Sequence, residues 1–141
     1  MLSDIDFNSR SAELLKVLNL HTDHVLSMSL LQDNTLVTSS KDRTLKFWDM
    51  ENFKLKYSKN LNTSELNAIE TISSGPLNGQ LAIACDNLIK IFNPKSGEIE
   101  MTLPGHTKTI NTLLSLPNGN LVSAGQDNVI KMWNTKTGIS M

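Results

Sequence analysis

The sequence carries no excess of charge of one sign and no strongly basic segment. It has 13 Lys and Arg residues against 14 Asp and Glu residues, for a net charge of −1. Proteins that bind nucleic acids usually carry a basic patch or stripe that contacts the phosphates. The charge balance therefore gives no support to such a function, although it does not exclude contact with RNA. The 39% hydrophobic and 19% charged residues are typical of a globular rather than a disordered chain.

Cysteine and long hydrophobic runs are also scarce. Cys85 is the single cysteine, so it has no partner for an internal disulfide, and its place in the apolar run 81–85 is typical of a buried, unreactive thiol. No apolar run approaches the roughly 20 residues that cross a bilayer. The first six residues include two acids rather than the basic start of a signal peptide. We therefore expect an intracellular, cytoplasmic protein in a reducing compartment.

What the sequence does contain is an internal repeat. Residues 36–42 match residues 121–127 at an offset of 85, and the same offset places His21 on His106 and Trp48 on Trp133. Half of that offset predicts a middle copy, which is present in weaker form at residues 81–93. A period near 42 lies in the range of about 40–45 residues for WD repeats, each of which forms one four-stranded propeller blade.

The local pattern in each copy predicts strands. Asn118-Gly119 and Asn78-Gly79 each separate two apolar runs, which is a strong hairpin signal, and Asp33-Asn34 holds the matching place in the first copy. We predict an all-β fold of three four-stranded antiparallel blades that form a partial, open propeller. A polar segment at 1–12 would precede repeats at about 13–54, 55–97 and 98–141. Residues 11–18 could form a short amphipathic helix, but we predict an outer strand at residues 14–18, because the copies place one before each His position.

Two dipeptide positions carry a resemblance to a known family. Leu20-His21 and Gly105-His106 stand at one position, and Trp48-Asp49 and Trp133-Asn134 at the other. Over residues 13–141 the chain resembles the WD-repeat β-propeller family. The resemblance implies one buried hydrogen-bond network in each of two blades, formed by His21, Thr38, Asp42 and Trp48 in the first and by His106, Ser123, Asp127 and Trp133 in the third.

The middle copy departs from this pattern. Asn62 takes the His place, Ala82 or Ile83 the hydroxyl place and Phe92 the Trp place, so that only Asp86 is retained. We predict that this blade is held together by apolar packing instead of a polar network.

The resemblance also implies a non-catalytic scaffold or adaptor that presents a rigid face to partner proteins or peptides. The matching positions are Thr22, Asp23, His24, Lys41, Arg43, Asn87, Thr107, Lys108, Gln126 and Asn128. The alternative is a structural subunit of an RNA- or ribosome-associated assembly.

Neither catalysis nor a cofactor is expected. Ser123, His106 and Asp127 have the composition of a hydrolase triad, as do Thr38, His21 and Asp42. Both hydroxyls lie in the middle of strands, outside any Gly-x-Ser-x-Gly elbow, and recur in two copies, which favours a structural role. His21 and His24 around Asp23 supply too few ligands for a metal site.

Three blades are fewer than the four to eight that propellers typically have. One hypothesis is that the chain is part of a longer propeller whose further blades complete the ring. The other is a homodimer of six blades, in which residues 14–18 of one chain complete the last blade of the other.

Overall fold

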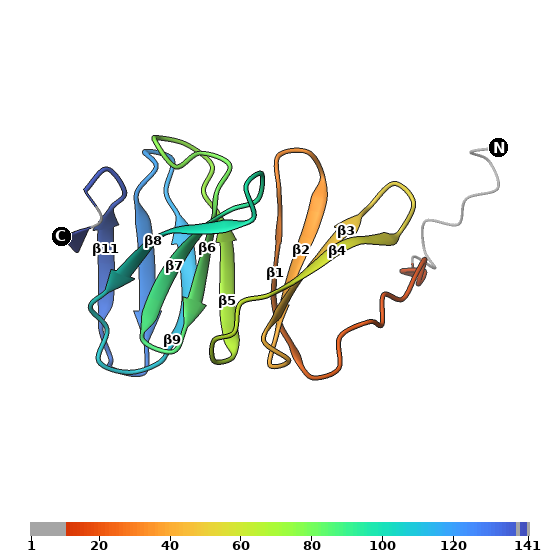
Figure 1. Ribbon diagram of the computed structural model, residues 1–141, viewed down its shortest axis with the longest axis horizontal. Helices are drawn as coiled ribbons and strands as arrows, with labels where there is room; N and C mark the ends of the chain where they lie inside the picture. Colours follow the sequence, from red (N-terminus) through yellow and green to blue (C-terminus); the bar gives the residue numbers. More distant parts are fainter. Residues whose placement is uncertain (1–10, 138, 141) are drawn as a thin grey trace.

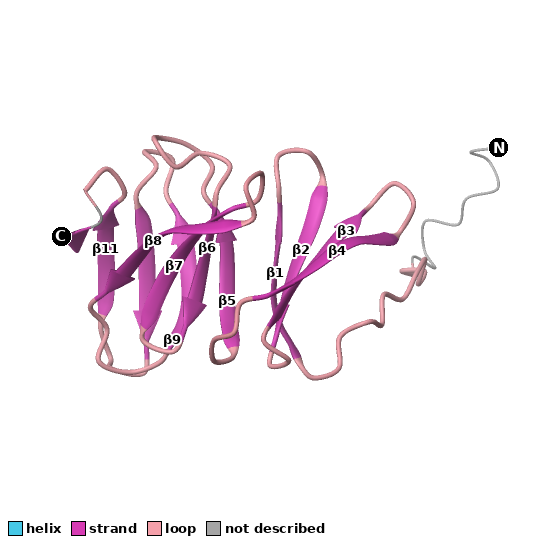
Figure 2. Ribbon diagram, viewed as in Figure 1, coloured by secondary structure: helices cyan, strands magenta, loops and turns pink. Residues whose placement is uncertain are grey.

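The computed structural model describes residues 11–137 and 139–140, and within them it contains strands and turns but no helix (Figures 1 and 2). Accordingly, no helix in this part of the chain could cross a membrane. Three antiparallel sheets of four strands follow one another along the chain, so the predicted fold class is confirmed. The first sheet is β1 (Val25–Leu30), β2 (Thr35–Ser40), β3 (Thr44–Asp49) and β4 (Lys54–Asn60); the second is β5 (Leu66–Thr71), β6 (Leu81–Cys85), β7 (Leu88–Asn93) and β8 (Glu98–Pro104); the third is β9 (Ile110–Ser115), β10 (Leu121–Gly125), β11 (Ile130–Asn134) and β12 (Ile139–Ser140).

The turns between the first two strands of each sheet form where the sequence predicts them. Asn34, Gly79 and Gly119 occupy matching turn positions with φ of 66°, 85° and 88°, a region open to glycine and tolerated by asparagine. Gly119 is also required for packing between sheets, because a Cβ atom there would lie 2.8 Å from the carbonyl oxygen of Ser74. The turns of the second and third sheets therefore touch through backbone.

Two apolar clusters hold the three sheets in a row (Figure 1). One joins the first and second sheets and includes Val37, Phe47, Ile83 and Phe92. The other joins the second and third sheets; among its members are Ala82, Ala84, Ile91, Leu121 and Trp133. The middle sheet thus contributes side chains from both of its faces, whereas each terminal sheet is covered by a neighbouring sheet on one face.

The innermost strands of neighbouring sheets run side by side and are linked by polar contacts. The Ser27 and Ser29 hydroxyls accept hydrogen bonds from the backbone N–H groups of Ile69 (3.1 Å) and Thr71 (2.9 Å). Both contacts join residues 42 apart in the chain, so β1 and β5 point the same way. The Ser73 N–H group likewise donates to Ser115 Oγ over 3.2 Å, again 42 residues along the chain. The corresponding turns of the three sheets therefore lie on the same side of the molecule.

The predicted outer strand at residues 14–18 is wrong. Residues 11–24 contain no strand, and Leu14 and Leu15 are about four-fifths exposed. A strand needs a neighbour with unpaired backbone groups. The segments at the same place before the next two copies, β4 and β8, pair with β3 and β7 of the sheet that precedes them, and among the described residues no sheet precedes residues 14–18.

The sheets are shifted relative to the predicted repeats. Residues 54–60, which were assigned almost entirely to the second repeat, form the fourth strand of the first sheet. Most of the predicted polar segment 1–12 lies outside the described residues.

Candidate functional site

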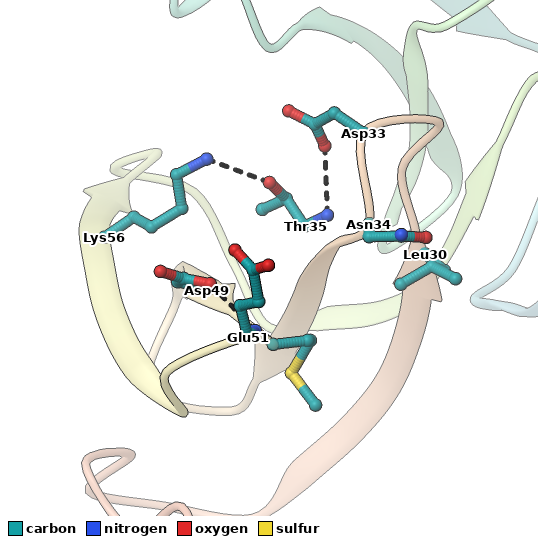
Figure 3. A pocket seen from close by; sticks show the side chains of 8 residues that line it. Leu30, Asp33, Asn34, Thr35, Asp49, Glu51 and Lys56 are labelled. Carbon is teal, nitrogen blue, oxygen red and sulfur yellow. Dashed lines mark hydrogen bonds between the residues drawn. The ribbon is translucent and has the colours of Figure 1, made fainter.

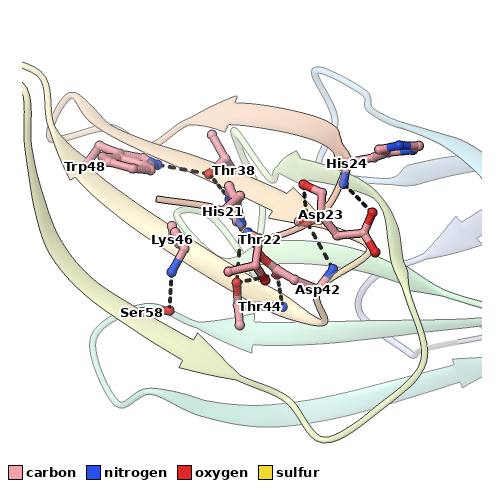
Figure 4. Close-up of polar contacts among 11 residues, drawn as sticks. His21, Thr22, Asp23, His24, Thr38, Asp42, Thr44, Lys46, Trp48 and Ser58 are labelled. Carbon is pink, nitrogen blue, oxygen red and sulfur yellow. Dashed lines mark hydrogen bonds and ion pairs between the residues drawn. The ribbon is translucent and has the colours of Figure 1, made fainter. Parts of the chain in front are cut away.

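The side chains of His21, Thr38, Asp42 and Trp48 lie in one chain of hydrogen bonds at the first sheet (Figure 4). The Trp48 Nε1–H group donates to Thr38 Oγ1 over 2.9 Å, and this oxygen lies 2.7 Å from His21 Nε2. His21 Nδ1 lies 2.8 Å from Asp42 Oδ2. The Asp42 carboxylate also accepts the backbone N–H groups of Thr22 (3.1 Å) and Thr44 (2.9 Å).

The third sheet repeats this arrangement 85 residues later. Trp133 Nε1–H donates to Ser123 Oγ over 2.8 Å, His106 Nε2 lies 2.7 Å from the same oxygen, and His106 Nδ1 lies 2.8 Å from Asp127 Oδ2. Thr107 N–H donates to Asp127 over 3.1 Å. These four distances differ from their counterparts in the first network by no more than 0.1 Å, although Thr in one network is replaced by Ser in the other. The N–H group at the start of the third strand lies 2.9 Å from the carboxylate in the first network and 3.3 Å in the second.

The order of donors and acceptors follows from the chemistry of each group. An ionised carboxylate only accepts, so the Nδ1 atom of each histidine carries the proton that faces the aspartate. In a neutral imidazole Nε2 is then an acceptor, and the threonine or serine hydroxyl donates to it. The hydroxyl oxygen remains free to accept the indole N–H. Each member thus satisfies its neighbour, as a buried polar network requires.

Both aspartates are held in the ionised form. Burial alone would raise the pKa of Asp42, but hydrogen bonds from Thr44, His21 and Thr22 outweigh it and keep the pKa well below its ordinary value. Burial likewise opposes ionisation of Asp127, and the contact with His106 and the N–H of Thr107 lower its pKa overall. The carboxylates are therefore acceptors throughout the neutral range.

The two hydroxyls are poorly placed for nucleophilic attack. Ser123 is 1% exposed and Thr38 8% exposed, and each oxygen already contacts an indole N–H and an imidazole nitrogen. A catalytic nucleophile needs access to substrate and nearby oxyanion donors. The contacts of each hydroxyl are instead those of a buried link between a histidine and a tryptophan.

The middle sheet contains apolar side chains where the other two have networks. Ile83 pairs across the sheet with Lys90, as Thr38 does with Lys46, which identifies Ile83 rather than Ala82 as the residue at the hydroxyl place. Ile83 and Phe92 are fully buried in the cluster shared with the first sheet. This sheet is therefore held by apolar packing, as predicted.

Asn62 and Asp86 do not take over the roles of His and Asp. Asn62 is exposed with a φ of 52°. The β6–β7 hairpin has only two turn residues, because the middle copy is one residue shorter there, and Asp86 consequently adopts a φ of 52° with an exposed side chain. Asp86 thus keeps the residue type of the other copies without a network role, and it contributes its backbone carbonyl, which accepts the N–H of Ile110 over 2.7 Å.

The ten predicted partner-facing residues lie in the loops and turns at one end of the sheets, a surface that we call the turn face. All are exposed except Lys41, which is partly buried. Hydrogen bonds tie the loops together: Lys41 N–H donates to the His24 carbonyl over 3.0 Å, and the Asn87 side chain donates to the His106 carbonyl over 3.1 Å. The turn face comprises Thr22, Asp23, His24, Lys41, Arg43, Asn87, Thr107, Lys108, Gln126 and Asn128.

A pocket of about 640 Å³ opens at the opposite end of the first sheet (Figure 3). It is lined by polar groups around the Thr35 hydroxyl, which accepts a hydrogen bond from Lys56 Nζ over 3.0 Å. Its lining residues are Leu30, Asp33, Asn34, Thr35, Asp49, Met50, Glu51 and Lys56. Across the part of the chain that the structure describes, no three His, Cys, Asp or Glu side chains are grouped as metal ligands would be.

One member of the first network was not predicted from the sequence. The Thr44 hydroxyl donates to Asp42 Oδ1 over 2.6 Å. Its counterpart in the third copy is Val129, which has no hydroxyl, so comparison of the copies gives no signal for it. The spacing Asp-x-Thr in a turn is a local signal, because such a hydroxyl can reach back to the preceding carboxylate.

Comparison with known proteins gives a consistent result. The family model described as "WD domain, G-beta repeat" matches residues 12–49 and 97–134, together just over half of the chain, and these ranges contain both networks. The chain is 32% identical over 97 residues to the "Ribosome biogenesis protein WDR12 homolog" of Culex quinquefasciatus, covering 66% of this chain and 22% of that protein. It is 31% identical over 111 residues to "Mitochondrial division protein 1" of Eremothecium gossypii, covering 66% of this chain and 15% of that protein. The chain thus spans less than a quarter of the length of these curated relatives.

Proposed function

Since this chain belongs to the WD-repeat family, we propose that it is a non-catalytic scaffold that binds partner proteins or peptides through the turn face. The observation that carries the proposal is the combination of exposed side chains with fixed loops. Nine of the ten residues of the turn face are exposed, while the buried networks lie directly beneath their loops.

The networks explain how such a surface can be rigid. The Asp42 carboxylate accepts N–H groups from Thr22, in the loop before β1, and from Thr44, at the start of β3. One side chain therefore fixes two separate loops relative to each other, and Asp127 does the same with Thr107 and Val129. A surface that is already ordered loses less entropy when a partner binds.

The absence of catalysis is also part of the proposal. Its support is that the only groups with the composition of a triad among the described residues, the two networks, have buried hydroxyls engaged with tryptophan and histidine. An intracellular setting is proposed as well, because the names of the matched relatives refer to ribosomes and mitochondria.

Charge reversal on the turn face tests the scaffold function. We would capture binding proteins from a host extract with the wild-type chain, with an Arg43→Glu and Lys108→Glu double variant, and with a control. The control reverses Lys95 and Lys136, which are exposed in turns at the opposite end of the sheets. The proposal expects the same proteins with wild type and control and their loss with the turn-face variant, while all three chains unfold at similar temperatures. An unchanged set of proteins with the turn-face variant would contradict it.

A second candidate function is a structural role in a ribosome-associated assembly. It is favoured by the names of two matched relatives, from Culex quinquefasciatus and Aedes aegypti, both called ribosome biogenesis proteins. The near-neutral charge argues for contact with the proteins of such an assembly rather than with its RNA. Co-sedimentation of the chain with ribosomal particles that persists after nuclease treatment would support this candidate, and its absence from those fractions would exclude it.

A further inference from the structure

The outer faces of the two terminal sheets carry exposed apolar side chains. The face of the first sheet that points away from the second sheet, here called the first flank, includes Val25, Met28 and Leu30, which are 55%, 70% and 54% exposed. The corresponding face of the third sheet, the third flank, has Leu114 and Ile130 at 55% and 76% exposed, together with Met132 at 42%. The two flanks lie at opposite ends of the row of sheets (Figure 1).

The internal repeat shows what kind of contact each flank resembles. The offset of 85 places Val25, Met28 and Leu36 on Ile110, Leu113 and Leu121, which are buried against the second sheet. The first flank therefore corresponds to the face of the third sheet that packs on the preceding, second sheet.

The third flank resembles the other side of such a junction. The same offset places Val37, Leu45 and Phe47 on Val122, Ile130 and Met132. The first three are fully or almost fully buried against the second sheet, whereas Ile130 and Met132 are exposed. The third flank thus corresponds to the face of the first sheet that packs on the next sheet along the chain. A junction between two sheets needs one face of each kind, and the two flanks together supply both.

One residue pair between the innermost strands of each junction distinguishes the two internal junctions from the two flanks. At the first internal junction Ser29 Oγ lies 2.7 Å from Thr71 Oγ1, and at the second Glu70 Oε1 accepts the N–H of Ser115 over 3.1 Å. Cross-strand register identifies Leu114 as the counterpart of Ser29 and Glu70. Leu114 pairs with Val122, Ser29 with Val37 and Glu70 with Ala82, and these three partners occupy the same place in the three copies. Leu30 is, in the same way, the counterpart of Thr71 and Ser115, which pair with Leu81 and Leu121, as Leu30 does with Leu36.

The two internal junctions therefore pair polar residues with polar residues, while the two flanks each offer leucine. We propose that the third flank binds the first flank of a second copy of this chain, with Leu114 of one copy against Leu30 of the other. Two copies related by a two-fold axis form this contact twice. The three described sheets of each copy would then form one ring of six, which is within the four to eight that are typical of propellers.

The inference does not depend on the scaffold function, because the flanks and the turn face consist of different residues. Leu30 and Leu114 are half exposed within one copy, so their substitution leaves the cores of the sheets intact. If the chain captures partner proteins but does not dimerise, only the dimer proposal fails. If it dimerises but captures no partner through the turn face, only the scaffold proposal fails.

The test is the solution mass of the full 141-residue chain, measured by light scattering during size exclusion. We expect about twice 15.6 kDa for the wild type. L30K and L114D should each raise the dissociation constant of the dimer by roughly 100-fold, because each places an unpaired charge against leucine. The double variant L30K/L114D should restore the dimer, because opposite charges then meet at both junctions. Thr102→Asp, on the exposed outer strand of the middle sheet, adds one charge away from both flanks and should leave the mass unchanged.

Three outcomes would overturn the proposal. A monomeric wild-type chain would show that the flanks are covered by something other than a second copy, such as further blades. A dimer that survives either single substitution would place its interface elsewhere. A double variant that stays monomeric, although its thermal unfolding matches that of the wild type, would show that Leu30 and Leu114 do not meet.

Discussion

At the scale of single residues, the three copies of the repeat serve as comparisons for one another. Ser39 is fully buried between the first and second sheets, and its hydroxyl has no hydrogen-bond partner among the described residues. The matching positions in the other copies hold Ala84 and Ala124. Serine at this place therefore carries the desolvation cost of a polar group that its counterparts avoid.

We expect Ser39→Ala to stabilise the protein by about 1 kcal/mol, because it removes a buried, unpaired hydroxyl without opening a cavity. Urea unfolding at neutral pH measures this change. The neighbouring Ser40→Ala is the matched control: Ser40 is equally buried, but its hydroxyl accepts the N–H of Asp42 over 3.0 Å, so its loss should destabilise. A destabilised Ser39→Ala variant would mean that the hydroxyl has a partner.

The low pKa of Asp42 predicts a pH-dependent stability. The unfolded chain binds a proton near the ordinary pKa of 3.8, whereas the folded chain does so only at lower pH. The stabilisation is therefore complete above about pH 4 and is lost as the pH falls towards the folded pKa. Asp42→Asn should melt at a lower temperature than wild type at pH 7, and the difference should shrink below pH 4. Thr44→Val, which removes one donor to the carboxylate, should show an intermediate effect, and a constant difference at all pH values would contradict this account.

At the scale of elements, the sequence predicted what local chemistry determines. Hairpin turns at Asn34, Gly79 and Gly119 follow from residues that tolerate positive φ, and the apolar runs beside them form the strands. The eight network residues could be located because both copies keep the same spacing. They could be placed together only through the resemblance, since neither periodicity nor composition brings His21 to Trp48.

The failures lie where an element depends on something outside its own residues. The strand predicted at residues 14–18 has apolar residues, but among the described residues no preceding sheet supplies the third strand that it would pair with. The middle copy keeps an aspartate at Asp86, but a turn that is one residue shorter changes its φ and leaves its side chain exposed, in line with the predicted lack of a network there. Thr44 was missed because its contact belongs to one copy only.

We expect the hydrogen-bond networks of the first and third sheets to contribute to the free energy of unfolding. His106→Ala breaks two contacts and leaves Ser123 and Asp127 short of partners in a buried site, so we expect a loss of about 2–4 kcal/mol in the free energy of unfolding. His24→Ala, at an exposed loop position, should change it by less than about 0.5 kcal/mol. Chemical denaturation measures both variants. Equal effects of the two substitutions would show that the buried network adds no stability.

At the scale of the whole molecule, the middle sheet is the element through which the terminal sheets are coupled. Its side chains enter both apolar clusters, and Ile83 is fully buried in the cluster shared with the first sheet. A stack in which each unit contacts only its neighbours can unfold as one body or unit by unit, depending on the strength of the junctions. The two tryptophans distinguish these cases, because Trp48 lies in the first sheet and Trp133 in the third.

We expect Ile83→Ala to lower the free energy of unfolding by about 2–4 kcal/mol through the cavity that it leaves. If the junctions are strong, the loss appears at both ends of the molecule, although Ile83 belongs to the cluster of the first junction alone. Fluorescence of single-tryptophan chains, with Trp48→Phe or Trp133→Phe as background, follows each end separately. Each Ile83→Ala chain is compared with its own background, because the tryptophan substitutions remove a hydrogen bond themselves. Equal shifts of the two transitions identify one cooperative unit, whereas a shift seen by Trp48 and not by Trp133 would show that the third sheet unfolds independently.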